Sequence, residues 1–256
     1  MGAFEAVSAK SALAALVVVG VVAVGGVTLL GGGGETTAVD QVPSGVDTVV
    51  RVDLTITDDR ATQLLAVASG ASLPGGDAGN VSQLRATVED RTGVDPGPAR
   101  ELVLFGTLND STTETTDAGV ILHTDAATET AVAGIRNATG GEYTERTVSG
   151  QPVYAPATRD GRWIGVLGEG EVVVGTRAAV SDTINVTAGD ADAFDGPLRT
   201  AYDDTTNGTV RFATTSPDVL LPPEAGFVTN VQLYRDLQTV GGTYYIQSGR
   251  TGVELR

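Results

Sequence analysis

Three aspartates in one short run are the residues of this chain best suited to bind a metal ion. Asp190, Asp192 and Asp195 lie in the sequence GDADAFDG, and carboxylate oxygens are the ligands that Ca²⁺ prefers in proteins. The run therefore predicts a calcium-binding loop. Its spacing is not that of an EF-hand, because the third aspartate comes one residue late and Ala201 stands where the twelfth-position glutamate belongs.

The same run also has an interpretation without metal. Asp192 or Asp195 is a suitable N-cap for a helix that runs toward Tyr202, because an Asp side chain accepts hydrogen bonds from the first helical N–H groups. Phe194 and Leu198 would then pack inward. In this interpretation the aspartates lie in a solvated turn and bind nothing.

The single histidine is the only side chain that could act as an imidazole base. His123 precedes Asp125 by two residues, but a nucleophile in a Gly-x-Ser-x-Gly elbow is missing from the sequence. The chain also has no cysteine, which excludes a cysteine nucleophile and leaves too few ligands for a zinc site. We therefore expect His123 to be a strand-end residue near a helix N-terminus, and we assign no catalytic residue.

The large aromatic side chains offer a possible binding groove for a glycan or a peptide. Because large aromatic side chains are few in this chain, we expect most of them to be buried in the hydrophobic core rather than to line a groove. They are Trp163, Tyr143, Tyr154, Tyr202, Tyr234, Tyr244 and Tyr245.

Asparagine is concentrated in N-glycosylation sequons. The chain has six asparagines, and five of them begin an Asn-x-Ser/Thr sequence, the acceptor motif for glycan on surfaces outside the cell. The alternative is that these asparagines cap helices or turns. The five are Asn80, Asn109, Asn137, Asn185 and Asn207.

The elements that carry these residues are predicted from hydrophobic periodicity. Alternation and β-branched residues predict strands, and spaced apolar positions predict helices. The strands are 48–57, 101–108, 119–123, 151–155, 162–167, 171–175, 209–214 and 243–247. The helices are 59–68, 81–92, 126–138, 178–186 and 228–240.

Two segments resemble each other at an offset of 52 residues: VILHTDAATETAV from Val120 and VVVGTRAAVSDTI from Val172. Each contains a strand, a threonine that suits an N-cap, and a helix that opens with Ala-Ala. A repeated strand-strand-helix unit predicts an α+β domain, with an antiparallel sheet and helices packed on one face. The turn from Gly168 to Glu171 predicts a hairpin between two of the strands.

An uncharged stretch near the N-terminus predicts a transmembrane helix. Residues 12–30 run for nineteen residues without a charge, enough to cross about 30 Å of hydrocarbon as a helix. Lys10 precedes the stretch, so residues 1–11 are expected in the cytoplasm and the rest outside the cell. The alternative is a cleaved signal peptide. Residues 31–42 predict a Gly-rich tether, and residues 43–256 an extracellular domain.

The charge balance points to a high-salt environment. The chain has 32 acidic and 16 basic residues, a net charge of -16, and Lys10 as its only lysine. Such an excess of like charge is tolerated where salt screens it. No cluster of basic residues that could contact phosphates is visible, so we expect no nucleic-acid partner.

The segments VPSGVDTVVRVDL, FGTL, GVIL, QPVYA, RWIGVLGEGEVVVGTRAAVSDTI and GDADAFDGPL together resemble uncharacterised membrane-anchored or secreted proteins of halophilic archaea. This family has no defined activity, so the resemblance implies a location and not a reaction. We expect a membrane-tethered ectodomain of the cell envelope with a non-enzymatic binding or scaffolding role, whose partner is an envelope protein or glycan. The alternative is a carboxylate-based surface hydrolase, with calcium as its cofactor.

Overall fold

The computed structural model describes residues 38–55, 99–109, 114–159, 161–215, 238–247 and 250–256. Several expectations fall outside these ranges: the membrane segment at 12–30, the helices at 59–68 and 81–92, and Asn80. Most of the helix expected at 228–240 is also outside, but its last residue, Val240, begins a strand. Among the residues that the structure describes, no helix is long and apolar enough to cross a membrane.

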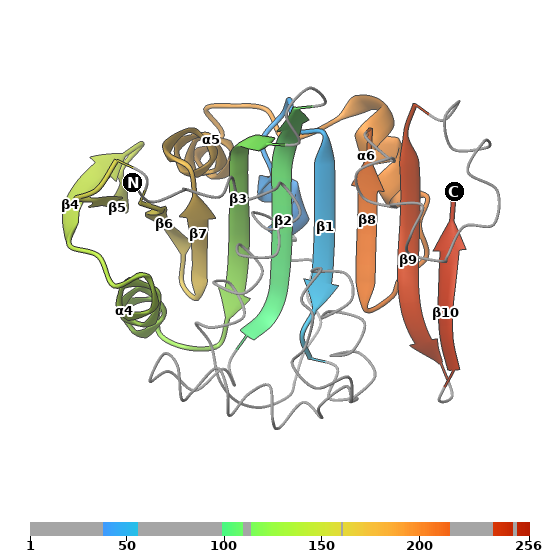
Figure 1. Ribbon diagram of the computed structural model, residues 1–256, viewed down its shortest axis with the longest axis horizontal. Helices are drawn as coiled ribbons and strands as arrows, with labels where there is room; N and C mark the ends of the chain where they lie inside the picture. The colour runs from blue at the N-terminus through green and yellow to red at the C-terminus, as the bar shows by residue number, and fades with distance from the viewer. Residues whose placement is uncertain (1–37, 56–98, 110–113, 160, 216–237, 248–249) are drawn as a thin grey trace, which may run out of the picture.

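The described residues form an α+β domain built on one antiparallel sheet (Figure 1). The order across the sheet is β10-β9-β8-β1-β2-β3-β7-β6-β5-β4. The strands are β1 (Thr48–Asp53), β2 (Ala99–Asn109), β3 (Glu114–Thr124), β4 (Tyr143–Val148), β5 (Gln151–Pro156), β6 (Trp163–Gly168), β7 (Glu171–Gly175), β8 (Val210–Thr214), β9 (Val240–Gln247) and β10 (Arg250–Leu255). The helices are η1 (Ala38–Gln41), α4 (Thr128–Thr139), α5 (Arg177–Ala188) and α6 (Gly196–Asp203).

Three meanders make up the sheet. The first, β1-β2-β3, lies in the middle; the second runs β4-β5-β6-β7 from one edge inward to pair with β3; the third runs β8-β9-β10 outward from β1. Within the described residues, β4 and β10 are therefore the edge strands. Neither was expected from the sequence, and neither was the separate helix η1.

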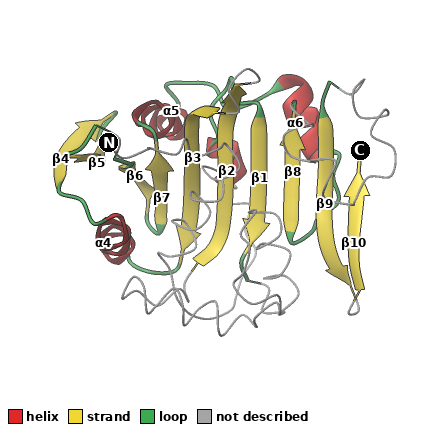
Figure 2. Ribbon diagram, in the orientation of Figure 1, coloured by secondary structure: helices red, strands yellow, loops and turns green. Residues whose placement is uncertain are grey.

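Helices lie on both faces of the sheet (Figure 2). In β7, Val172 packs in a core with Ile135 of α4, whereas its neighbour Val173 packs in another core with Ile184 of α5 and Leu198 of α6. Because successive strand residues point to opposite faces, α4 covers one face and α5 and α6 the other. The expectation that all helices pack on one face is wrong for α4.

The two segments with related sequences accordingly differ in structure. Each is a strand followed by a helix, β3-α4 and β7-α5, but the helices pack on opposite faces. Thr176 caps α5, since its hydroxyl accepts a hydrogen bond from the Ala179 N–H at 3.2 Å. Thr124 does not cap α4, which begins at Thr128 with Ala127 as its N-cap. Sequence similarity here marks a shared local pattern.

The folded part begins earlier than residue 43. Ala38, Val39 and Val42 are each at most 2% exposed and belong to the core that α5 and α6 cover. These apolar side chains hold η1 against the sheet, so residues 38–42 are part of the domain and not of the Gly-rich tether.

Candidate functional site

The aspartate run lies in the connection from α5 to α6. The side chains of Asp190, Asp192 and Asp195 are exposed, and the backbone of the run is held to the chain after η1. Ser44 N–H donates to the Asp192 carbonyl at 3.1 Å, and Phe194 N–H donates to the Val42 carbonyl at 2.9 Å. Within the described part of the chain, no three acidic or histidine side chains converge as a metal would require.

The turn interpretation of this run fits the structure. Asp195 occupies the N-cap position of α6, although its side chain makes no capping hydrogen bond. Phe194 and Leu198 are 3% and 5% exposed, as expected for inward-facing residues. The run positions α6 against the sheet.

His123 does not pair with Asp125. The Asp125 carboxylate instead accepts from the Arg100 guanidinium. The Nδ1 atom of His123 lies 3.9 Å from Oε1 of Glu171 on the neighbouring strand. The histidine is, as expected, at the end of its strand, and its acidic neighbour comes from β7.

Cross-strand pairing places His123 in a row of carboxylates that the sequence did not predict. Glu101 of β2 lies opposite both Asp53 of β1 and His123 of β3. His123 in turn lies opposite Glu171 of β7. Because directly opposed residues in an antiparallel sheet share a face, the four side chains form one row, which we call the carboxylate row.

Two polar residues bind the carboxylate row. The Arg51 guanidinium donates to both carboxylate oxygens of Glu101, at 3.0 and 3.3 Å. The Gln41 amide nitrogen of η1 donates to Glu171 at 2.8 Å. Burial acts to lower the pKa of Arg51, but the hydrogen bonds and charge of Glu101 outweigh it and raise the pKa above its ordinary value. These acids are held in ion pairs and hydrogen bonds.

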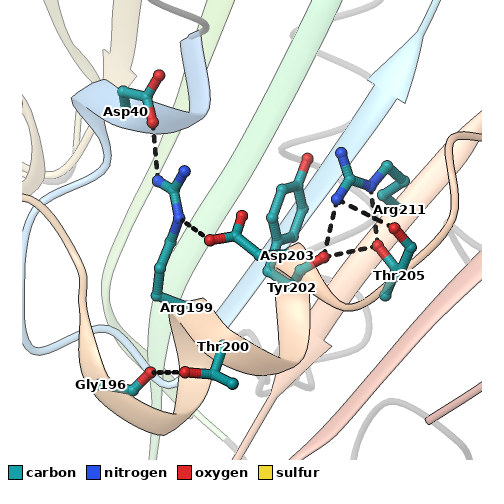
Figure 3. Close-up of polar contacts among 8 residues, drawn as sticks. All are labelled: Asp40, Gly196, Arg199, Thr200, Tyr202, Asp203, Thr205 and Arg211. Carbon is teal, nitrogen blue, oxygen red and sulfur yellow. Dashed lines mark hydrogen bonds and ion pairs between the residues drawn. The ribbon is translucent and has the colours of Figure 1, made fainter.

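A second polar cluster surrounds α6 (Figure 3). Arg199 bridges two carboxylates, Asp40 at 2.7 Å and Asp203 at 2.8 Å. Arg211 of β8 donates to the Tyr202 carbonyl and to the Thr205 hydroxyl, each at 2.8 Å. The two guanidinium groups thereby fasten α6 to η1 on one side and to the sheet on the other.

Tyr202 lies at the centre of this cluster. Its ring packs edge-on against Phe194, with 6.2 Å between centroids, and the Arg211 guanidinium lies 4.2 Å from its centroid. Its hydroxyl is buried with no hydrogen-bond partner among the described residues. Burial raises the pKa of Tyr202 to about 12, against the lowering effect of the Arg211 and Arg51 charges.

The aromatic residues with described side chains do not form one groove. Tyr143 and Tyr154 lie with α4 on one face, Trp163 lies with α5 on the other, and Tyr202 is in the core. Tyr234 and the side chains of Tyr244 and Tyr245 lie outside the described part.

The sequons differ in their structural setting. Asn137 and Asn185 lie in the last turns of α4 and α5, Asn207 is exposed in the connection from α6 to β8, and Asn109 ends β2. The threonines of the two helical sequons donate to helix carbonyls: Thr139 to Ile135 at 2.9 Å and Thr187 to Thr183 at 3.0 Å. Both of these sequons are folded into helices.

Comparison with known proteins identifies no family for this chain. No protein-family model matches the chain, and no curated protein matches its sequence. Two solved structures, described as crystal forms III and I of TP0453, align with it. The first has a TM-score of 0.49 and 11% identity over 87% of this chain and 80% of that one. The second has a TM-score of 0.46 and 10% identity over 87% of this chain and 78% of that one.

Proposed function

We propose that this protein is a membrane-tethered ectodomain of the cell envelope, adapted to high salt, whose role is binding or scaffolding. The observation that carries the proposal is the uncharged run of nineteen residues at 12–30, followed by a folded domain that begins by Ala38. A helix of that length fits the hydrocarbon thickness of a membrane. The orientation with residues 1–11 in the cytoplasm rests on Lys10.

Ion pairs withdraw three of the described carboxylates from general acid–base catalysis. Among the described residues, Glu101 pairs with Arg51, Asp125 with Arg100, and Asp40 with Arg199. A general acid or base must be free to exchange a proton with a substrate. These carboxylates are committed to arginines whose charge is permanent.

The test is the location of the chain in membranes that contain it. The full chain stays in the pellet after an alkaline wash, and protease added to intact cells removes its domain. Val18→Arg with Val21→Arg places two charges at the centre of the apolar run and releases the chain, because charges at that depth are costly. Val7→Arg adds one positive charge outside the run and leaves the chain in the pellet. Release of the unmodified chain by the wash contradicts the tether.

The carboxylate row carries a second candidate function, a carboxylate-based surface hydrolase. The Nδ1 atom of His123 and the Oε1 atom of Glu171 lie 3.9 Å apart at one end of the row, so a proton would pass between them through a bridging water. Calcium at Asp190, Asp192 and Asp195 is the cofactor of this candidate. If the protein is a hydrolase of this kind, Glu171→Gln abolishes hydrolysis of an envelope glycan or peptide. A calcium chelator then has the same effect as Asp192→Asn. Retained hydrolysis in Glu171→Gln excludes it.

A further inference from the structure

The arginines of the domain fall into two groups. Those outside residues 131–180 whose side chains are described all have polar partners: Arg51, Arg100, Arg199 and Arg256 form ion pairs, and Arg211 donates to oxygen atoms of α6 and the loop after it. Five others form no ion pair or hydrogen bond within the described residues. They are Arg136, Arg146, Arg159, Arg162 and Arg177.

All five lie at one end of the sheet. That end consists of β4, β5 and β6 with the helices α4 and α5 beside them, at the left of Figure 1. Residues 131–180 contain five arginines and five acids, whereas the whole chain has twice as many acids as bases. Residues 131–180 therefore carry no net charge, and their arginines are unpaired within the described residues.

Two of these arginines share one aromatic ring. The Arg177 guanidinium lies 5.4 Å and the Arg146 guanidinium 6.0 Å from the centroid of Trp163. Both arginines are exposed. A single guanidinium is enough for a cation–π contact, and bringing a second positive charge to the same ring adds repulsion. A negative group between the guanidinium groups and solvent would remove that repulsion.

The other face of the same end repeats this chemistry. Arg136 of α4 is exposed and lies 5.7 Å from the Tyr143 centroid and 5.6 Å from the Tyr154 centroid. Tyr143 belongs to the edge strand β4, whose four middle residues are exposed. Arginines stacked on aromatic rings thus lie on both faces of the sheet beside the edge strand β4. We call Arg136, Arg146 and Arg177 with their three rings the arginine end.

We propose that the arginine end binds an anionic polysaccharide that carries carboxylate or sulfate groups. A guanidinium group holds such an anion with two parallel hydrogen bonds, and the aromatic ring beneath it fixes its plane. Binding sites on both faces of one edge suit an extended polymer more than a small ion.

This inference names the binding partner within the proposed function, but its test does not depend on the membrane tether. The full chain in detergent micelles is titrated with heparin as a sulfated polymer, polygalacturonate as a carboxylated polymer, and dextran as an uncharged one. Titrations are made at 0.2 and 1 M KCl (roughly 7 and 3 Å of Debye length). Binding to at least one anionic polymer but not to dextran is expected, and it weakens at the higher salt.

Variants assign the binding to these residues. Arg146→Gln and Arg177→Gln each lower the affinity about tenfold, and the double variant lowers it further. Arg100→Gln removes the same charge from an arginine that is already paired with Asp125, and leaves the affinity unchanged. The double variant Arg146→Lys with Arg177→Lys keeps both positive charges but replaces each planar guanidinium group, which can make two parallel hydrogen bonds, with an ammonium group. Weaker binding is therefore expected here too. Circular dichroism confirms that each variant is folded.

Three results overturn the proposal. The first is that neither anionic polymer binds at either salt concentration. The second is an equal loss of affinity in Arg100→Gln and Arg146→Gln, because the binding would then reflect overall charge. The third is an oligomer that dissociates in Arg146→Gln, because the arginine end would then be a contact between copies of this chain.

Discussion

Tyr202 is a buried tyrosine whose hydroxyl group has no hydrogen-bond partner among the described residues. A buried polar group without a partner costs free energy on folding. Tyr202→Phe removes that cost while keeping the ring that packs on Phe194, so we expect it to raise the unfolding free energy by about 1 kcal/mol at neutral pH. Tyr143→Phe is the matched control. It loses the hydrogen bond of 2.8 Å to Thr139 and destabilises the protein.

The same residue predicts a change of stability at high pH. Burial raises the pKa of Tyr202 to about 12 from 10.0, so the folded protein holds the phenolic proton more tightly than the unfolded chain. The unfolding free energy is then unaffected by this group below about pH 10 and falls by roughly 3 kcal/mol toward pH 12. Urea titrations across this range should show a smaller fall in Tyr202→Phe, and equal falls would contradict the assignment.

The sequons predict a difference in glycan occupancy. Asn207 is exposed in a connection, whereas Asn137 and Asn185 lie in helices whose carbonyls accept from the sequon threonines. If the glycan is added to the folded domain, Asn207 carries it and the two helical asparagines carry less. Mass spectrometry of glycopeptides from native material measures the occupancy. An Asn207 without glycan together with a glycosylated Asn137 would contradict this prediction.

At the scale of elements, two turn glycines offer a matched pair of substitutions. Gly170, between β6 and β7, has a φ of +69°, and a Cβ there would lie 2.2 Å from the Thr124 carbonyl oxygen. Gly150, between β4 and β5, has a φ of +81° and open space around it. We expect Gly150→Ala to cost about 1 kcal/mol for the left-handed backbone. Gly170→Ala should cost clearly more, since the backbone of β3 must also move. Equal melting temperatures for the two variants would contradict this packing of the β6–β7 turn.

The strands inside the sheet could be predicted from the sequence, but its edges could not. The strand expected at 171–175 is observed as Glu171–Gly175, because three valines in succession are bounded by glycines. The edge strand β4 reads YTERTV and exposes four of its six side chains, so it lacks the apolar alternation that marks a strand. Alternation of apolar residues in a sequence arises when one face of a strand is buried. An edge strand whose side chains are mostly exposed shows little of this alternation.

The carboxylate row could not be predicted for a different reason. Glu101, His123 and Glu171 lie on three strands, and the row exists because β3 pairs with β7 rather than with β4, the next strand along the chain. Hydrophobic patterns indicate where strands occur but not their order. The aspartate run, in contrast, was visible as a cluster in the sequence, and its turn interpretation fits because Phe194 and Leu198 pack inward.

For the whole molecule, charge predicts a dependence on salt. Residues 31–256 contain 31 acids and 15 arginines, and self-repulsion of this size destabilises the compact state. The melting temperature should climb steeply up to about 1 M KCl, where the Debye length is about 3 Å, and then more slowly. A need for millimolar calcium with little response to KCl would instead indicate a metal site at Asp190, Asp192 and Asp195. A melting temperature that changes with neither KCl nor calcium would contradict the high-salt adaptation.

The central claim, a domain that stays joined to its membrane segment, is tested most directly by peptide mapping of the chain extracted from membranes. Trypsin cleaves after Lys10, and the next basic residue is Arg51, within β1. We predict that the intact peptide 11–51 is recovered, because it contains the apolar run, the tether, η1 and the start of the sheet in one covalent piece. A mature N-terminus between Gly31 and Glu35, with this peptide missing, would show a cleaved signal peptide and contradict the tether.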